Sequence, residues 1–123
     1  MIELDPQFTY PPPAYSYVAI ADGQKRHNKA RVFAGRYHSE DHSVPVIVVV
    51  KCGTEIEQRG PKPGNRGKRD SQVLLMDFLS KVMFDERLSP LQFDLFTKMT
   101  AIAHPGGLPL DLQRDKVQRK SSL

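Results

Sequence analysis

Three short apolar segments separated by polar turns occupy the first half of the chain. They are residues 15–21 (YSYVAIA), 31–38 (RVFAGRYH) and 44–50 (VPVIVVV), all rich in aromatic or β-branched side chains. Such segments, bounded by turn residues such as Asp22-Gly23, predict three β-strands. The unbroken apolar run of 44–50 predicts a strand covered on both faces, and therefore the central strand of the sheet. Gly35, inside the second segment, predicts a bulge.

In the second half, apolar residues recur at helical spacing in two segments. They are Leu75, Phe78, Leu79 and Val82, in a segment that runs to Arg87, and then Leu91, Leu95, Met99 and Ile102. Asp70 or Ser71 can cap the first helix, and Ser89-Pro90-Leu91-Gln92 has the pattern of a capping box with proline at the first helical position. His104-Pro105-Gly106-Gly107 ends the second helix. The short link between the segments predicts an antiparallel helix pair.

This order of elements predicts an α+β fold: a three-stranded antiparallel meander followed by an antiparallel two-helix hairpin packed on one face. Residues 1–14, which contain four prolines, predict an extended N-terminal arm. Residues 15–107 then form a single domain, and 108–123 form a basic C-terminal tail. The helices leave one sheet face open, and apolar side chains on it need the arm, a ligand or a second copy of the chain as cover. We therefore expect a homodimer.

Composition sets the broad class of the protein. The hydrophobic fraction of 39% and the charged fraction of 26% are those of an ordinary globular domain. A single cysteine, Cys52, cannot form an internal disulfide, and no leader-like segment or long apolar run is evident. These features predict a cytoplasmic protein in a reducing compartment, without a membrane partner.

Charge distribution indicates a polyanionic partner. The net charge is only +4, but +4 lies in residues 24–31, +5 in 59–69 and +3 in 113–123. Residues 59–69 (RGPKPGNRGKR) contain three glycines and two prolines, which predicts a mobile loop able to follow a phosphate backbone. Cations expected to contact phosphates are Lys25, Arg26, Lys29, Arg59, Lys62, Arg66, Lys68 and Arg69. The alternative is a plain flexible linker.

Aromatic residues add to this hypothesis if they share the open face. With Val18 and Val32 turned toward the helices, strand alternation places Tyr15, Tyr17, Phe33 and Tyr37 on that face. Tyr17, Phe33 and Tyr37 are the expected stacking groups, and stacking favours single strands over duplexes. The alternative is that these rings belong to the core or to a dimer contact.

A proline motif offers a different function. Pro12-Pro13-Ala14-Tyr15 resembles the Pro-Pro-x-Tyr ligands of WW domains, which implies recruitment of a protein partner through Pro12, Pro13 and Tyr15. If Tyr15 begins a strand, it is not available for such a partner.

Residues suited to metal binding or catalysis are sparse. His38 and His42 flank a turn, but Cys52 lies about 26 Å away along a strand, so the three cannot share a zinc ion. Glu55 and Glu57 beside the basic loop give a phosphodiesterase a weak physical basis. The sequence therefore predicts no catalytic residue, no metal and no cofactor, and a non-catalytic nucleic-acid-binding protein.

Overall fold

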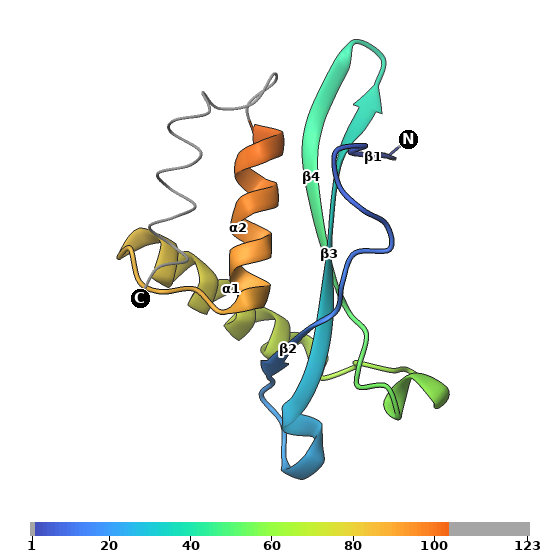
Figure 1. Ribbon diagram of the computed structural model, residues 1–123, viewed down its shortest axis with the longest axis vertical. Coiled ribbons are helices and arrows are strands. Elements are labelled where there is room, and N and C mark those ends of the chain that lie inside the picture. The colour runs from blue at the N-terminus through green and yellow to red at the C-terminus, as the bar shows by residue number, and fades with distance from the viewer. Residues whose placement is uncertain (1, 104–123) are drawn as a thin grey trace.

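The structure, a computed structural model, describes residues 2–103 and contains a four-stranded antiparallel sheet built around one long strand (Figure 1). That strand is β3 (His27–Ser39). One edge of β3 pairs with both β1 (Ile2–Leu4) and β2 (Tyr15–Val18), at opposite ends, and the other edge pairs with β4 (His42–Lys51). The β3–β4 hairpin turns at Glu40-Asp41 and extends past the other elements.

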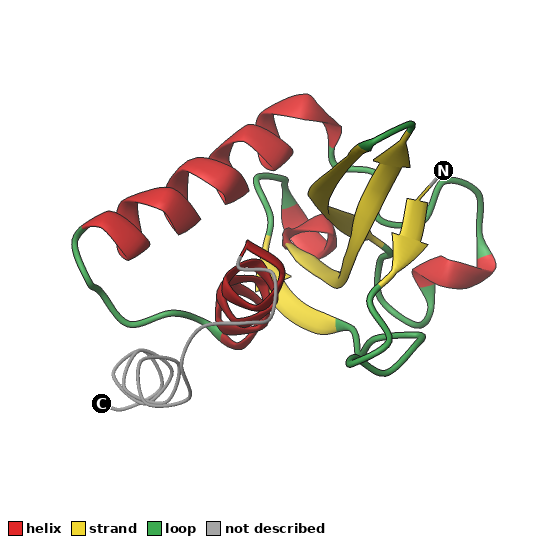
Figure 2. Ribbon diagram, turned by 90° about the horizontal axis from the view of Figure 1, so that it is seen from above, coloured by secondary structure: helices red, strands yellow, loops and turns green. Residues whose placement is uncertain are grey.

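Alternation along β3 places its even-numbered side chains in the core. Ala30, Val32 and Ala34 are fully buried beneath α2 (Pro90–Ala103), which runs alongside β3 and β4 on one face of the sheet (Figures 1 and 2). α2 contributes four apolar side chains to the same side, namely Leu91, Leu95, Phe96 and Ile102. Because β-strand side chains alternate, Tyr15 and Tyr17 of β2 and Ile47 and Val49 of β4 pack against this core as well.

The expected capping box forms at the start of α2. The Ser89 amide donates to the Gln92 side-chain oxygen at 3.0 Å, and the Gln92 amide donates to the Ser89 hydroxyl at 3.3 Å. Gln92 also contacts the preceding helix, because its amide group donates to Asp77 at 2.7 Å and its oxygen accepts from Lys81 at 3.2 Å. This polar junction joins the two helices where the chain turns between them.

α1 (Gly67–Met83) does not lie beside α2. It crosses α2 and extends away from the sheet, and the segment before Ser89 connects the two helices (Figures 1 and 2). Phe78, 2% exposed, is its main apolar anchor. The α+β class with an antiparallel sheet and two helices is confirmed, but a side-by-side helix hairpin on one face is not found. Helical periodicity fixes which residues share a face, and does not fix the crossing of two helices.

Three details of the predicted sheet are wrong. Residues 44–50 form an edge strand among the described residues, because β4 pairs with β3 alone. The N-terminal arm contains a strand, β1. Gly35 is not a bulge: it pairs regularly with Leu4 and Val46, and a Cβ there would collide with the Glu3 carbonyl oxygen. Glycine is needed at that position for the close approach of β1.

The N-terminal segment packs along β3 between β1 and β2. The Asp5 amide and the Tyr10 hydroxyl both donate to the Ala34 carbonyl, at 3.0 and 2.9 Å. Tyr10 stacks on Phe33 with ring centroids 6.2 Å apart. Part of the sheet face expected to be open is therefore covered by the same chain, which weakens the argument for a homodimer. The predicted helix stop at 104–107 and the tail 108–123 lie outside the described residues, and the domain limits stay a prediction.

Candidate functional site

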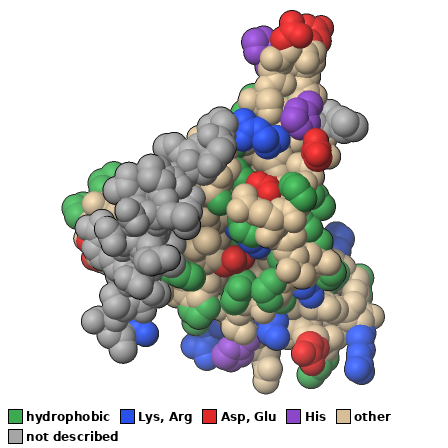
Figure 3. All heavy atoms as spheres, turned by 45° about the horizontal axis from the view of Figure 1, so that its top comes forward, with side chains coloured by type: hydrophobic (Ala, Val, Ile, Leu, Met, Phe, Trp, Pro, Cys, Tyr) green, Lys and Arg blue, Asp and Glu red, His purple; other side chains and the backbone are tan. Residues whose placement is uncertain are grey.

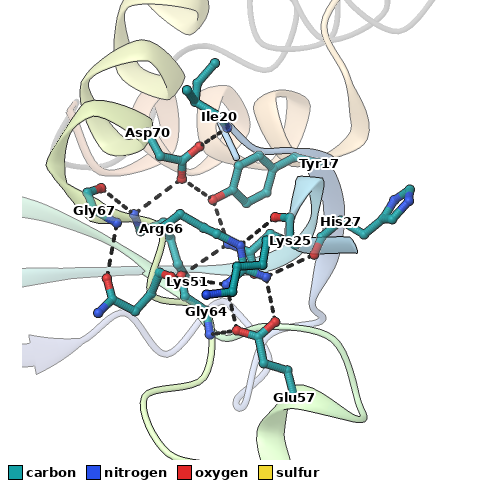
Figure 4. Close-up of polar contacts among 12 residues, drawn as sticks. Tyr17, Ile20, Lys25, His27, Lys51, Glu57, Gly64, Arg66, Gly67 and Asp70 are labelled. Carbon is teal, nitrogen blue, oxygen red and sulfur yellow. Dashed lines mark hydrogen bonds and ion pairs between the residues drawn. The ribbon is translucent and has the colours of Figure 1, made fainter. Parts of the chain in front are cut away.

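Asp70, in the first turn of α1, is the centre of a buried polar cluster (Figure 4). It is 2% exposed, and both of its carboxylate oxygens are occupied. The Ile20 amide donates to Oδ1 at 2.9 Å, while the Tyr17 hydroxyl and Lys51 Nζ reach Oδ2 at 2.7 and 3.3 Å. Burial, and the hydrogen bond that its hydroxyl donates to Asp70, raise the pKa of Tyr17 well above its usual value. One carboxylate thus ties α1 to the end of β2 and to β4.

Arg66, just before α1, makes the second part of the cluster. Its guanidinium donates two bonds of 2.6 Å to the two carboxylate oxygens of Glu57, and further bonds to the carbonyls of Lys25 and His27. The Arg66 side chain is 2% exposed. The Arg66 hydrogen bonds lower the pKa of Glu57 to about 2, and the Glu57 carboxylate in turn raises the pKa of Arg66. This bidentate ion pair holds η2 (Glu57–Arg59) against β3.

Gly64 and Asn28 connect the two parts. The Gly64 amide donates to Glu57 at 2.7 Å, and Asn28 Nδ2 donates to the Gly64 carbonyl at 3.3 Å and to the Tyr17 hydroxyl at 2.8 Å. Gly64 has a φ of 80°, and a Cβ there would collide with the Lys51 carbonyl. The loop that reads as mobile in the sequence is therefore bound to the sheet at Gly64 and Arg66.

Two consecutive cations remain outside this cluster. Lys68 and Arg69 lie in the first turn of α1, between the anchored Arg66 and Asp70, and both are exposed. Among residues 2–103, no acidic side chain forms an ion pair with either of them. Acidic and histidine side chains project at the tip of the β3–β4 hairpin (Figure 3). Lys and Arg side chains gather mainly at the opposite end of the molecule. That cationic end includes a cleft of about 490 Å³ lined partly by Lys25, Lys62 and Arg66.

The structure does not bring the predicted phosphate contacts together as one surface. Lys25 and Arg26 lie in η1 (Gly23–Arg26), Lys29 lies on β3, Arg59 ends η2, and Lys62 lies in the following turn. Arg66 is directed inward. Lys25 and Arg26 in η1 and Lys68 and Arg69 in α1 are two separate exposed pairs, and only the second lies between two anchored residues, Arg66 and Asp70.

The predicted stacking surface is absent from the described residues. Tyr15 and Tyr17 pack against the core, whereas Val18 is 80% exposed, so the faces of β2 are the reverse of those expected, while Val32 and Ala34 of β3 are buried as expected. Phe33 does face away from the helices, but Tyr10 stacks on it. Tyr37 lies opposite Ile2 of β1. The physical reason is Asp70: its bond to the Tyr17 hydroxyl favours the inward orientation of β2 tyrosines.

The proline motif is likewise built into the fold. Pro12 is fully buried, and its carbonyl accepts a hydrogen bond from Arg31. Pro13 is exposed, but Tyr15 begins β2 and packs on the core. A WW-type domain would need these residues to leave their positions, so recruitment through Pro12, Pro13 and Tyr15 does not fit the structure.

The acidic residues do not form a metal site either. Among residues 2–103, no group of three or more His, Cys, Asp or Glu side chains is arranged to hold a metal ion. Glu57 is committed to Arg66 and Gly64, and Glu55 lies outside any strand. The arrangement that motivates a phosphodiesterase is therefore missing.

Sequence reasoning missed the network residues Asp70, Lys51 and Asn28. Asp70 reads as a helix cap, and neither Lys51 nor Asn28 belongs to a motif that marks it. A signal was present, because RGKRD places an arginine and an aspartate four residues apart around two further cations. Nothing in the sequence says which of these side chains turn inward.

Comparison with known proteins assigns the family. A family model described as chitin synthase matches residues 2–108. The chain belongs to the chitin synthase family. It is 50% identical over 107 residues to chitin synthase C of Emericella nidulans, which covers 80% of this chain and 9% of that protein. It is also 53% identical over 97 residues to chitin synthase 3 of Candida albicans and 52% identical over 96 residues to chitin synthase 3 of Saccharomyces cerevisiae, with 72% of this chain and 8% of each relative covered.

The chain therefore spans less than a tenth of the length of these chitin synthases. No solved structure matches it. Family membership overturns the prediction of a non-catalytic nucleic-acid-binding protein, because chitin synthases are glycosyltransferases. A nucleic-acid partner has no support.

The cytoplasmic assignment is also wrong for this family, whose members are membrane enzymes. None of the helices described here is long and apolar enough to cross a membrane.

Proposed function

We propose that this chain is a section of a chitin synthase and that it helps to bind the activated sugar donor during glycosyl transfer. The observation that carries the proposal is the inward anchoring of Arg66 and Asp70, which leaves Lys68 and Arg69 exposed between them on a fixed backbone. Family membership supplies the reaction class.

Glycosyl transfer releases an anionic leaving group, which in activated sugar donors usually carries phosphate. Cations that are already oriented stabilise such a group without reorganising during the reaction. Arginine can donate two parallel hydrogen bonds to a phosphate, and lysine adds a compact charge. Lys68 and Arg69, in the first turn of a helix whose amide dipoles also favour anions, are suited to that role.

Phosphate contact by the basic loop thus reappears in a narrower form. Of the eight cations in the sequence hypothesis, this proposal uses Lys68 and Arg69. Arg66 is paired with Glu57, and the other five lie in η1, β3, η2 and the turn after η2. The proposed ligand is a single phosphorylated sugar donor, in place of the nucleic acid that the sequence suggested.

A chimera tests this function. The matching segment of Saccharomyces cerevisiae chitin synthase 3 would be replaced by this chain, and chitin synthesis measured in membranes of the host. We expect an active chimera. Lys68→Ala and Arg69→Ala should each raise KM for the donor or lower kcat/KM by about tenfold, the effect of losing one charge-assisted hydrogen bond.

Arg59→Ala is the matched control, because Arg59 is an exposed cation of the same loop at the end of η2. It should leave kcat/KM within about twofold of the parent chimera. Equal kinetics for the parent and the Lys68→Ala/Arg69→Ala double variant would refute the donor role.

A further inference from the structure

The outer edge of β4 has no partner among residues 2–103. The Cys52 amide donates to the Lys29 carbonyl at 2.8 Å, which fixes the alternation of the β3–β4 ladder. Val48 and Val50 therefore direct their backbone groups toward β3. Ile47 and Val49 direct their N–H and C=O groups away from β3, to the free edge.

From Val46 to Val50 this edge lacks the features that keep exposed edges from pairing. No charged residue lies between Ser43 and Lys51, and Pro45, which does blunt an edge, lies at the end near the hairpin turn. Edge strands that face water are usually short, charged or bulged, whereas β4 is ten residues long and paired regularly throughout. From Val46 to Val50 the sequence is that of an interior strand.

The face of β4 turned away from the helices supports the same conclusion. Val44, Val48 and Val50 are 53%, 43% and 42% exposed, in a row on that face. An uninterrupted apolar strand is typical of a position where both faces and both edges are covered. Here one face and one edge are covered.

A strand is the occupant that can pair with the edge and also lay its side chains beside the valines. A helix could cover the valines, but its own backbone groups are already paired within it, so it could not complete the ladder at the edge. Relatives of this chain are more than ten times its matched length, so they contain ample additional polypeptide. We propose that the free edge of β4 pairs with a β-strand from the remainder of the chitin synthase polypeptide, which makes β4 an interior strand of a larger sheet.

This inference rests on the proposed function, since it takes the chain as a section of a chitin synthase. The sharpest test is amide hydrogen exchange of Ile47 and Val49 in the isolated chain and in the chimeric synthase. Both amides should exchange fast in the isolated chain and at least about 100-fold more slowly in the synthase. Val48 and Val50, hydrogen-bonded to β3, are internal controls that should be protected in both.

A proline substitution tests the edge by a second route. Ile47→Pro removes an outward N–H and no β3–β4 hydrogen bond, as Pro45 already does two residues earlier. Ile47→Ala removes comparable packing but keeps the N–H. In the isolated chain the two variants should unfold at similar denaturant concentrations. In the chimera, Ile47→Pro should lower the amount of folded synthase by about tenfold relative to Ile47→Ala.

The outcomes separate the two proposals. An inactive parent chimera counts against the proposed function alone, because exchange at Ile47 and Val49 reports pairing without any activity. Equally fast exchange of these amides in the synthase and in the isolated chain overturns the strand proposal. Protection in the isolated chain that grows with its concentration also overturns it, because a second copy would then be filling the edge.

Discussion

At the scale of the residue, Gly64 is the position that tolerates a side chain least. Its φ of 80° lies in the left-handed region, and a Cβ would meet the Lys51 carbonyl. Its amide and carbonyl are both bonded within the cluster, to Glu57 and Asn28. The sequence marks Gly64 only as one of three glycines in a basic loop. Gly64 joins the loop to the sheet because its backbone lies against that of Lys51. The composition of the loop does not show this contact.

Three glycines of the same region form a graded series. Gly64→Ala should lower the free energy of unfolding by about 2 to 4 kcal/mol, because it combines left-handed strain with a backbone collision. Gly67→Ala should cost about 1 kcal/mol, since Gly67 has a φ of 80° but open space around its Cβ position. Gly60→Ala should change stability by no more than about 0.5 kcal/mol. Urea unfolding of the isolated chain measures all three, and equal costs at Gly64 and Gly67 would contradict the collision.

At the scale of the element, local signals were reliable and their assembly was not. The capping box at Ser89 and Gln92 formed as the pattern predicts, because its hydrogen bonds lie within one turn. The central position of β4 was wrong, although the run VPVIVVV does indicate burial. That signal fits the interior position proposed above for β4, which the described residues alone do not provide. The inward faces of β2 were reversed because both parities contain apolar side chains.

The link between η2 and α1 should respond to acid. Glu57 has a pKa of about 2 in the folded chain and 4.5 ordinarily, so its stabilising effect is complete above about pH 4.5 and is lost as the pH falls toward 2. Glu57→Gln should therefore lower unfolding free energy by about 1 to 2 kcal/mol at pH 6, a range that allows for partial solvent screening of the pair.

The difference between the parent chain and Glu57→Gln should shrink toward zero near pH 2. Urea unfolding at pH 6 and at pH 2.5 measures it, with exposed Glu55→Gln as a control that should change little at either pH. A pH-independent difference would mean that Glu57 acts through shape rather than charge.

At the scale of the whole molecule, α1 carries apolar side chains both on the side that packs on the protein and on a side that the described residues leave exposed. Phe78 and Leu74 turn toward the body of the protein, and Leu75 lines a cavity beside them, while Leu79 and Met83 lie farther around the helix and are 44% and 76% exposed. The sequence analysis predicted this helix from Leu75, Phe78, Leu79 and Val82. Helical spacing alone does not show which of these side chains are buried, because residues three and four apart spread over a broad apolar stripe.

Charge placed on the outer side of α1 should therefore not disturb the fold of the isolated chain. We expect Leu79→Glu/Met83→Glu to change the free energy of unfolding by no more than about 0.5 kcal/mol, since neither side chain contributes to the described core and glutamate is a good helix former. The same variant should raise the protein concentration at which the chain aggregates, because exposed apolar patches drive association. Phe78→Ala, one residue from Leu79 but buried, should cost about 3 to 5 kcal/mol. Urea unfolding and light scattering measure the two effects separately, and a large loss of stability in the Leu79→Glu/Met83→Glu variant would mean that this side of α1 is packed within the chain itself.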